Sequence, residues 1–481
     1  MTTPVQQKKL GFWQKTAYGL GDIFGGGSGT LIGIYYLIFL TDVIRISPAL
    51  AGTVFLISKA YDAITDPFEG VISDRTRTRF GRRKPYLIAG VPLVFLSFFA
   101  LFYPINMEGE TQRFVFVILT YLFFSTVVSI VMLNYNALQS EITLDYNERT
   151  QLSSFRIFFS TVASILAALL PMEIVEAFPD VRQGFIVMGL VFGAIFALPF
   201  LATIFVTKER EEFQKPPKQI NLRAAILEPF KVRTFVIALL MYLFAFVAMD
   251  TVMTIVAYFM KYYLLRPDEI DLVSGAMLIS QVISLPFYTW LSKKTSKQNG
   301  FAIGAGIWIL TMLTSFLLGP SNPGFFVYVF AILVGIGTGG VVVMIYAIFP
   351  DLPDVDELHS GERREGIYAS LVGWIRKLSS AFAIFTVANA IDAAGYIVPI
   401  ETVVDGATKM IEQPQSDEFI FVLRMVFSFV PMVMVGLSLF FAFRYPLAPK
   451  VHARLGNFLA AVRSGKEPDE DGEELKKLLI G

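Results

Sequence analysis

Apolar runs of about twenty residues recur through almost the whole of this 481-residue chain. A run of that length is long enough to cross the hydrocarbon core of a bilayer as an α-helix. The composition agrees, because 54% of the residues are hydrophobic and only 17% are charged, whereas a soluble chain has about 25% charged residues. The sequence therefore predicts an all-α membrane protein, and it excludes a soluble enzyme, a secreted disulfide scaffold and a disordered chain.

Scarce residue types exclude several chemistries. The absence of cysteine excludes disulfides, thiolate catalysis and cysteine-ligated metal centres. His359 and His452 are the two histidines, too few for a typical transition-metal site. Forty basic and 40 acidic residues cancel, so the net charge does not indicate nucleic acid. We therefore expect that the protein is not an enzyme and that it binds no cofactor. The expected partners are the lipid bilayer and a small molecule, and the expected oligomeric state is a monomer.

The apolar segments divide into two sets of six on either side of a polar connection at 208–232. Two six-helix halves are typical of major-facilitator-type transporters. We expect an N-terminal six-helix bundle over 1–207, a cytoplasmic loop at 208–232, a C-terminal six-helix bundle over 233–444 and a cytoplasmic tail at 445–481. The twelve expected transmembrane helices are 17–41, 48–72, 85–105, 112–139, 152–175, 183–207, 233–263, 270–292, 299–319, 325–349, 366–396 and 416–444.

Charge in the connections predicts the orientation. Arginine and lysine concentrate after the second span at 75–84, and again between the sixth and seventh spans. The connections that follow odd-numbered spans are acidic or nearly neutral, as at 173–180 and 401–412. The positive-inside rule then places both termini in the cytoplasm, which requires an even number of spans. No small-residue cleavage site follows the polar N-terminus, so we expect no removable signal peptide.

The second span contains two carboxylates on one helical face. Asp62 and Asp66 are four residues apart, and Thr65 lies beside them. Each charge costs about 2.5–3.5 kcal/mol at the bilayer centre. A bound cation such as Na⁺, or a proton, relieves both the burial and the mutual repulsion. The alternative is pairing with Lys59 or with arginines of the next loop. Asp22 in the first span is a further cation ligand, an ion-pair partner or an interfacial group.

Polar side chains in the fourth and fifth spans are candidates for substrate binding. Asn134, Tyr135 and Asn136 offer amides and a phenol to substrate hydroxyls. Arg156 lies about one turn inside the fifth span, where it could bind hydroxyls or an anionic group. Hydrogen bonding between helices and a snorkelling arginine are the structural alternatives.

The eleventh span adds a second candidate pair. Trp374 and Lys377 are three residues apart and share a face, an arrangement that suits a sugar ring with its hydroxyls. Arg376 points elsewhere, and we interpret it as packing against lipid headgroups. Asp250 in the seventh span is isolated in the sequence, and an ion pair or a gate is as consistent with it as a substrate contact.

Five segments in the two halves carry a family resemblance. They are Tyr18–Asp22, Tyr61–Pro67, Gly70–Pro85, Glu141–Thr150 and Pro350–Gly366, the last followed by Lys377. In this order they resemble the glycoside–pentoside–hexuronide:cation symporter family. The resemblance implies the major facilitator fold, alternating access and uptake of a glycoside coupled to Na⁺, Li⁺ or H⁺ in a bacterial inner membrane. It also implies that Asp62 and Asp66 bind the coupling cation and that Lys377 lies near both sites.

The resemblance also shows departures and alternatives. Gly26, Met132 and Asn136 fall where galactoside transporters of the family have two aspartates and a tryptophan, which implies a different sugar site. Distant animal relatives carry lysophospholipids with sodium, so a lysophospholipid or another amphiphile is the alternative substrate. A non-transporting membrane sensor is the alternative of a different class.

We expect the arginine-rich loop to close the cytoplasmic side through ion pairs with neighbouring helix ends. The alternative is that its charges set only the topology. The candidate gate residues are Asp74, Arg75, Arg82, Arg149 and Asp351.

Overall fold

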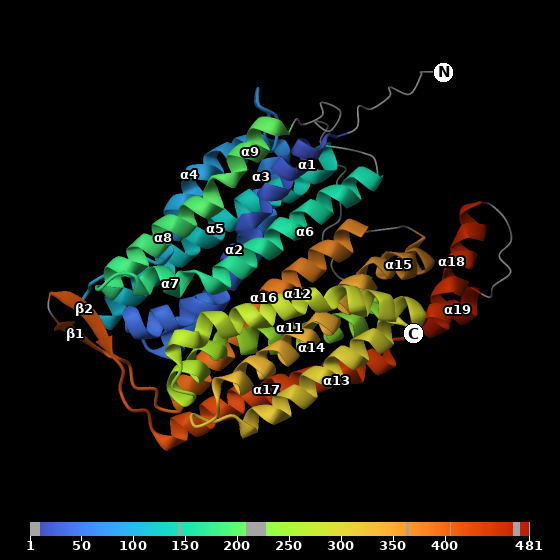
Figure 1. Cartoon of the computed structure of the whole chain (residues 1–481). Coiled ribbons are helices and arrows are strands. Elements are labelled where there is room, and N and C mark those ends of the chain that lie inside the picture. The colour runs from blue at the N-terminus through green and yellow to red at the C-terminus, as the bar shows by residue number, and fades with distance from the viewer. Residues whose placement is uncertain are drawn as a thin grey trace. The chain divides into compact units, whose positions relative to one another are not determined.

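The computed structural model describes residues 10–142, 146–207, 228–361, 365–404, 406–464 and 472–480. The chain divides into two compact units, each a bundle of helices (Figure 1). Unit 1 comprises Met1–Lys218 with Ile397–Pro414, and unit 2 comprises Gln219–Tyr396 with Gln415–Gly481. The prediction of an all-α membrane protein is confirmed.

Unit 1 contains the helices of the N-terminal half and a two-stranded hairpin. Its elements are α1 (Phe12–Leu20), α2 (Asp22–Leu31), the π-helices η1 (Ile32–Tyr36) and η2 (Phe39–Val43), α3 (Pro48–Arg75), α4 (Lys84–Leu101), α5 (Glu110–Ile142), α6 (Tyr146–Leu169), α7 (Pro171–Glu176), α8 (Val181–Ala197), α9 (Pro199–Val206), β1 (Ile400–Val404) and β2 (Ala407–Ile411).

Unit 2 contains the helices of the C-terminal half and the tail. Its elements are η4 (Glu228–Lys231), α11 (Arg233–Tyr258), the π-helix η5 (Phe259–Tyr263), η6 (Pro267–Glu269), α12 (Ile270–Lys294), α13 (Lys297–Thr314), η7 (Ser315–Leu317), α14 (Gly324–Ile348), η8 (Phe349–Asp351), α15 (Leu352–Ser360), α16 (Glu365–Ala393), α17 (Asp417–Arg444), α18 (Pro449–Arg463) and α19 (Gly472–Leu479).

Among the described residues, 10 helical segments are long and apolar enough to cross a membrane. They correspond to the third to twelfth expected spans. The first two expected spans are also helical, although neither reaches that threshold. A turn at Gly21 divides the first of them, and Lys59, Asp62 and Asp66 reduce the hydropathy of the second. Twelve transmembrane helices therefore remain a prediction.

A glycine-rich run in α14 allows two neighbouring helices to approach closely. A Cβ atom on Gly335 would lie 2.0 Å from the hydroxyl oxygen of Ser280 in α12. A Cβ atom on Gly340 would lie 2.5 Å from the ring of Tyr288 in α12 and 2.9 Å from the Cα atom of Gly304 in α13. Small residues permit this kind of backbone approach in membrane bundles, where dispersion contacts drive helix association.

The first helical segment of each unit ends in the same local structure. The π-helices Phe39–Val43 and Phe259–Tyr263 are each followed, two residues later, by a non-glycine residue with positive φ. These residues are Arg45, with φ 61°, and Leu265, with φ 57°. The rarity of this conformation outside glycine indicates that the two units are internal repeats, as in major facilitator halves.

The C-terminal tail packs on unit 2. Leu475 and Leu479 of α19 are buried. The hydroxyl of Thr234, at the start of α11, donates a hydrogen bond of 2.6 Å to the backbone oxygen of Leu479. The tail therefore covers the first turn of α11, where backbone groups lack partners inside the helix.

Candidate functional site

Arg156 forms the centre of a polar cluster inside unit 1. Its guanidinium donates to Gln139 Oε1 at 2.9 Å, to Asn136 Oδ1 at 2.6 Å and to Asp22 Oδ1 at 3.2 Å. It also lies 4.9 Å from the centroid of the Tyr135 ring. The cluster therefore joins α2, α5 and α6 through a single planar cation, whose fork of donors fits several acceptors at once.

Two stacked tyrosines support this cluster. The rings of Tyr18 and Tyr135 lie 4.8 Å apart with an interplanar angle of 19°. The Tyr18 hydroxyl donates to the backbone oxygen of Tyr135 at 3.0 Å, and the Tyr135 hydroxyl donates to that of Tyr18 at 2.6 Å. Because both phenols satisfy backbone acceptors, Tyr135 contributes its ring face to Arg156, while its hydroxyl stabilises the contact between α1 and α5.

Asp62 forms a separate buried contact on α3. Its carboxylate accepts a hydrogen bond and ion pair from Lys59 Nζ at 2.8 Å and a hydrogen bond from Ser125 Oγ at 2.6 Å. The Asp62 side chain is only 3% exposed. This is the pairing with Lys59 that the sequence left open as an alternative to a cation. It gives the buried carboxylate one positive neighbour and a hydroxyl from α5.

The other proposed cation ligands lie in different surroundings. Thr65 donates its hydroxyl to the backbone oxygen of Tyr61 at 3.1 Å, and Thr65 and Asp66 are both half-buried. Asp22 contacts Arg156 rather than any group of the Asp62 contact given above. Among the described residues, no group of three histidine, cysteine or acidic side chains could hold a metal ion. The cation-binding assignments remain predictions.

Asn134 is oriented away from the Arg156 cluster, although it is adjacent to Tyr135 in the sequence. Its side-chain oxygen accepts from the hydroxyl of Ser73 and from Arg83, and its amide nitrogen donates to the backbone oxygen of Ile130. The geometry therefore ties Asn134 to the end of α3 and to the arginine-rich loop.

Arg376 and Asp250 form an ion pair in unit 2. Two guanidinium nitrogens of Arg376 contact the two carboxylate oxygens of Asp250 at 2.5 and 2.8 Å. The guanidinium also lies 4.7 Å from the centroid of the Phe246 ring. The interpretation of Arg376 as a lipid-facing residue was therefore wrong, because its charge is matched inside the unit by a bidentate contact. The opposite charges in two apolar spans were the signal for this pair.

Arg156 and Arg376 occupy corresponding places in the two internal repeats. They are separated by the same number of residues as Arg45 and Leu265, which mark the repeat. Each arginine lies on the fifth long helix of its half and binds an aspartate on the first helical segment of the same half. Each guanidinium also lies over an aromatic ring. Corresponding arginines in the two repeats therefore each bind an aspartate of the first helical segment, although the two aspartates themselves are not at corresponding positions.

The remaining substrate candidates lie beside this pair on α16. Trp374 is 44% exposed, and Lys377 is half-buried. Their spacing on a helix places them on neighbouring turns of one face, as expected from the sequence. Their role in substrate binding remains a prediction.

The gate candidates are described only in part. Arg82 is buried in unit 1. Asp351 in unit 2 accepts an ion pair of 2.5 Å from Lys297 at the start of α13. The side chains of Asp74, Arg75 and Arg149 lie outside the described part of the structure. Their role as a gate remains a prediction.

The sequence is similar to known membrane transporters over nearly its whole length. Residues 17–448 match the family described as MFS/sugar transport protein. The inner membrane symporter YicJ of Escherichia coli (strain K12) is 26% identical over 92% of this chain and 93% of its own. The isoprimeverose transporter of Lactiplantibacillus pentosus is 24% identical over 88% of this chain and 86% of its own. The sodium-dependent lysophosphatidylcholine symporter 1 of Gallus gallus is 22% identical over 98% of this chain and 94% of its own.

Solved structures show the same fold. The inward-open structure of the xylose transporter XylE from Escherichia coli matches with a TM-score of 0.62 at 15% identity, and the match covers 97% of this chain and 99% of that one. The prediction of a major facilitator fold is confirmed, and at this identity the likeness concerns the fold alone.

Proposed function

The chain belongs to the MFS/sugar transport protein family, and from this premise we propose that it couples a monovalent cation to the uptake of a sugar or glycoside. Family membership makes it a multi-pass membrane transporter rather than an enzyme. The proposed mechanism is alternating access, in which the two halves expose the binding sites to one side of the membrane at a time.

The buried carboxylate of Asp62 is the observation that carries the coupling proposal. An intramembrane carboxylate is costly unless it is paired, and here Lys59 supplies the pairing charge. Na⁺, Li⁺ or H⁺ would replace the ammonium group of Lys59 on the same oxygens, with Asp66 and Thr65 completing the cation site. Because Lys59 and Asp62 both lie on α3, replacing the ammonium group of Lys59 by a free cation would link cation binding to a rearrangement of this helix.

The Arg156 cluster supports a polar substrate. It combines a guanidinium with two amide groups, and these groups suit the hydroxyls of a sugar ring. In unit 2, we assign Trp374 and Lys377 to substrate binding. The name of the isoprimeverose transporter also supports a glycoside.

A lysophospholipid is the second candidate substrate. The similarity to a sodium-dependent lysophosphatidylcholine symporter over 98% of this chain favours it. A guanidinium could bind the phosphate of such a lipid as readily as a sugar hydroxyl. Both candidates share the cation-coupled mechanism and differ only in the molecule that binds.

We further propose the bacterial inner membrane as the location, with both termini in the cytoplasm. The similarity to an inner membrane symporter of Escherichia coli supports this location. The arginine and lysine residues in alternate connections support the orientation.

Isothermal titration of the detergent-purified protein tests the proposal. NaCl and LiCl are titrated first, and isoprimeverose and lysophosphatidylcholine are then titrated with and without Na⁺ at several pH values. Linkage requires the cation and the substrate to change each other's affinity by the same factor, typically about 5–150-fold. Asp62→Asn should abolish this coupling, whereas Asp268→Asn, at an exposed carboxylate, should retain it. Cation-independent binding of a substrate would contradict the proposal.

A further inference from the structure

The β1–β2 hairpin belongs to unit 1, although it is inserted between two helices of unit 2. The segment Ile397–Pro414 groups with unit 1, whereas α16 precedes it and α17 follows it in unit 2. The boundaries expected from the sequence placed this segment in the C-terminal half, at 233–444. The two strands pair from Ile400 with Ile411 to Val404 with Ala407.

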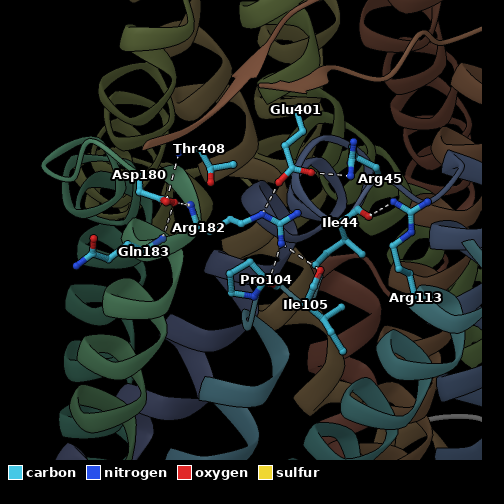
Figure 2. A network of polar contacts seen from close by, with 10 residues as sticks. All are labelled: Ile44, Arg45, Pro104, Ile105, Arg113, Asp180, Arg182, Gln183, Glu401 and Thr408. Carbon is cyan, nitrogen blue, oxygen red and sulfur yellow. Dashed lines mark hydrogen bonds and ion pairs between the residues drawn. The ribbon is translucent and has the colours of Figure 1, made fainter. Parts of the chain in front are cut away.

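Glu401 on β1 is bound by two arginines of unit 1 (Figure 2). Its carboxylate contacts Arg45 Nη2 at 2.6 Å and Arg182 Nε at 2.8 Å. The Glu401 side chain is 19% exposed, and those of Arg45 and Arg182 are 29% and 14% exposed. One carboxylate thus joins the connection after the first helical segment to the start of α8.

Arg182 extends the network to a third connection of unit 1. It donates to the backbone oxygens of Pro104 at 3.0 Å and Ile105 at 3.2 Å, between α4 and α5 (Figure 2). The hairpin therefore docks on a surface built from the connections after the first, third and fifth spans. In the expected twelve-span topology these three connections have the same parity and lie on one side of the membrane.

Asp180 provides a second contact with the hairpin. It caps α8 by accepting from the backbone nitrogens of Arg182 at 2.8 Å and Gln183 at 3.2 Å, and it accepts from the backbone nitrogen of Thr408 at 3.3 Å. Burial raises the pKa of this carboxyl, but the hydrogen bonds from Gln183, Thr408 and Arg182 outweigh it and hold the pKa below its ordinary value. The ionised cap therefore supports the docked hairpin.

Short segments connect the docked hairpin to unit 2. The Tyr396 hydroxyl lies 2.7 Å from that of Tyr262, and the Tyr396 ring packs against Phe419 at the start of α17. Four residue steps separate this anchor from Ile400, and six separate Ile411 from Asp417. Fully extended, these segments reach about 14 Å and about 21 Å.

We propose that the hairpin is a releasable strap, in which Glu401, Arg45 and Arg182 hold a segment of the C-terminal half on the N-terminal half. While it is docked, the two short segments limit how far the ends of the halves can separate on this side of the membrane. Undocking removes this limit, so the ion pairs of Glu401 control how often this side opens. The strap relies on the proposed function only for the alternating access that it restrains.

A cysteine-free chain makes the strap directly measurable. Spin labels at Gln183→Cys and Val403→Cys, both at exposed positions, report the distance between α8 and the hairpin by pulsed electron resonance. We expect one short distance in the parent protein, and Glu401→Gln should add a longer one. The matched control is Lys409→Gln, which removes an exposed charge from the same hairpin. Equal distance distributions in Glu401→Gln and Lys409→Gln would overturn the proposal.

A disulfide between Asp180→Cys and Thr408→Cys provides the complementary measurement. Oxidation should fix the hairpin on α8 and slow exchange between labels placed on the two halves by more than about 10-fold, and a reductant should restore the rate. An unchanged exchange rate after complete cross-linking would also overturn the strap. Neither readout requires a transported substrate, so a failure of the symport proposal is distinguishable from a failure of the strap.

Discussion

Asp62 has to exchange partners if it binds the coupling cation, because Lys59 already contacts its carboxylate at 2.8 Å. We predict that Lys59→Met raises the affinity for Na⁺, since it removes a tethered competitor and a repulsive positive charge. The gain should be on the order of 10-fold if Lys59 occupies the carboxylate for most of the time. Isothermal titration of Na⁺ measures it, with Lys294→Met as the control at an exposed lysine. An unchanged or weaker Na⁺ affinity would show that Lys59 does not compete for the site.

Arg156 distributes its donors over three side chains, and a lysine cannot reproduce that geometry. Arg156→Lys should lower substrate affinity by about 10- to 150-fold, equivalent to the 1.5–3 kcal/mol of a charged hydrogen bond. Direct titration of isoprimeverose and lysophosphatidylcholine measures the effect. Na⁺ binding in the same variant shows whether Asp22, which contacts Arg156 and is itself a candidate cation ligand, belongs to the cation site. Parent-like affinity for a substrate that does bind would remove Arg156 from the proposed site.

The sequence predicted part of this residue-scale picture. The Lys59–Asp62 contact follows from their spacing on one helix, so it was foreseen as an alternative. The pair of Arg376 and Asp250 joins residues 126 positions apart, and only the fold shows that their two helices place them in contact. Asn134 turns away from the cluster of its neighbour Tyr135 because adjacent residues on a helix point in different directions.

At the scale of elements, helix packing in unit 2 depends on the glycines of α14, which have no side chain to hold the neighbouring helices apart. An ideal Cβ atom on Gly335 would lie 2.2 Å from the backbone oxygen of Met277, so α12 and α14 would have to separate. Gly335→Ala should destabilise the protein by about 1–3 kcal/mol. Gly306→Ala is the matched control, because its Cβ atom meets nothing within 4 Å and alanine favours a helix by about 1 kcal/mol. Thermal unfolding in detergent measures the effect. The midpoint temperature should fall in Gly335→Ala and not in Gly306→Ala, and equal midpoints in the two variants would contradict this packing.

Long apolar helices were predictable from the sequence, whereas interruptions and short elements were not. The periodicity of an apolar span does not reveal the turn at Gly21 or the π-helices, because the apolar pattern indicates a long helix but not where its hydrogen bonding changes. The hairpin does have a sequence signal, since Asp405–Gly406 between alternating segments is typical of a two-residue turn. Gly406 adopts φ 78°, a conformation that favours glycine.

At the scale of the whole molecule, the chain consists of two internal repeats whose sequences have diverged. A division near the polar connection was predictable, since the two units separate between Lys218 and Gln219, whereas six spans in each half remain a prediction. The correspondence of Arg156 with Arg376 became visible only through the matching backbone at Arg45 and Leu265. The two aspartates are not at corresponding positions, because the place of Asp22 is taken by Tyr242 in the second half. The repeat therefore fixes the arginines and leaves their partners free to differ.

Symport is the central claim at this scale, and uptake into proteoliposomes tests it most directly. Accumulation of radiolabelled isoprimeverose and lysophosphatidylcholine is measured with an inward gradient of Na⁺, Li⁺ or H⁺ and again without a gradient. We predict that one gradient drives accumulation of one of these molecules, and that Asp62→Asn abolishes this accumulation while Asp268→Asn does not. Uptake of the same extent with and without every gradient would contradict the account.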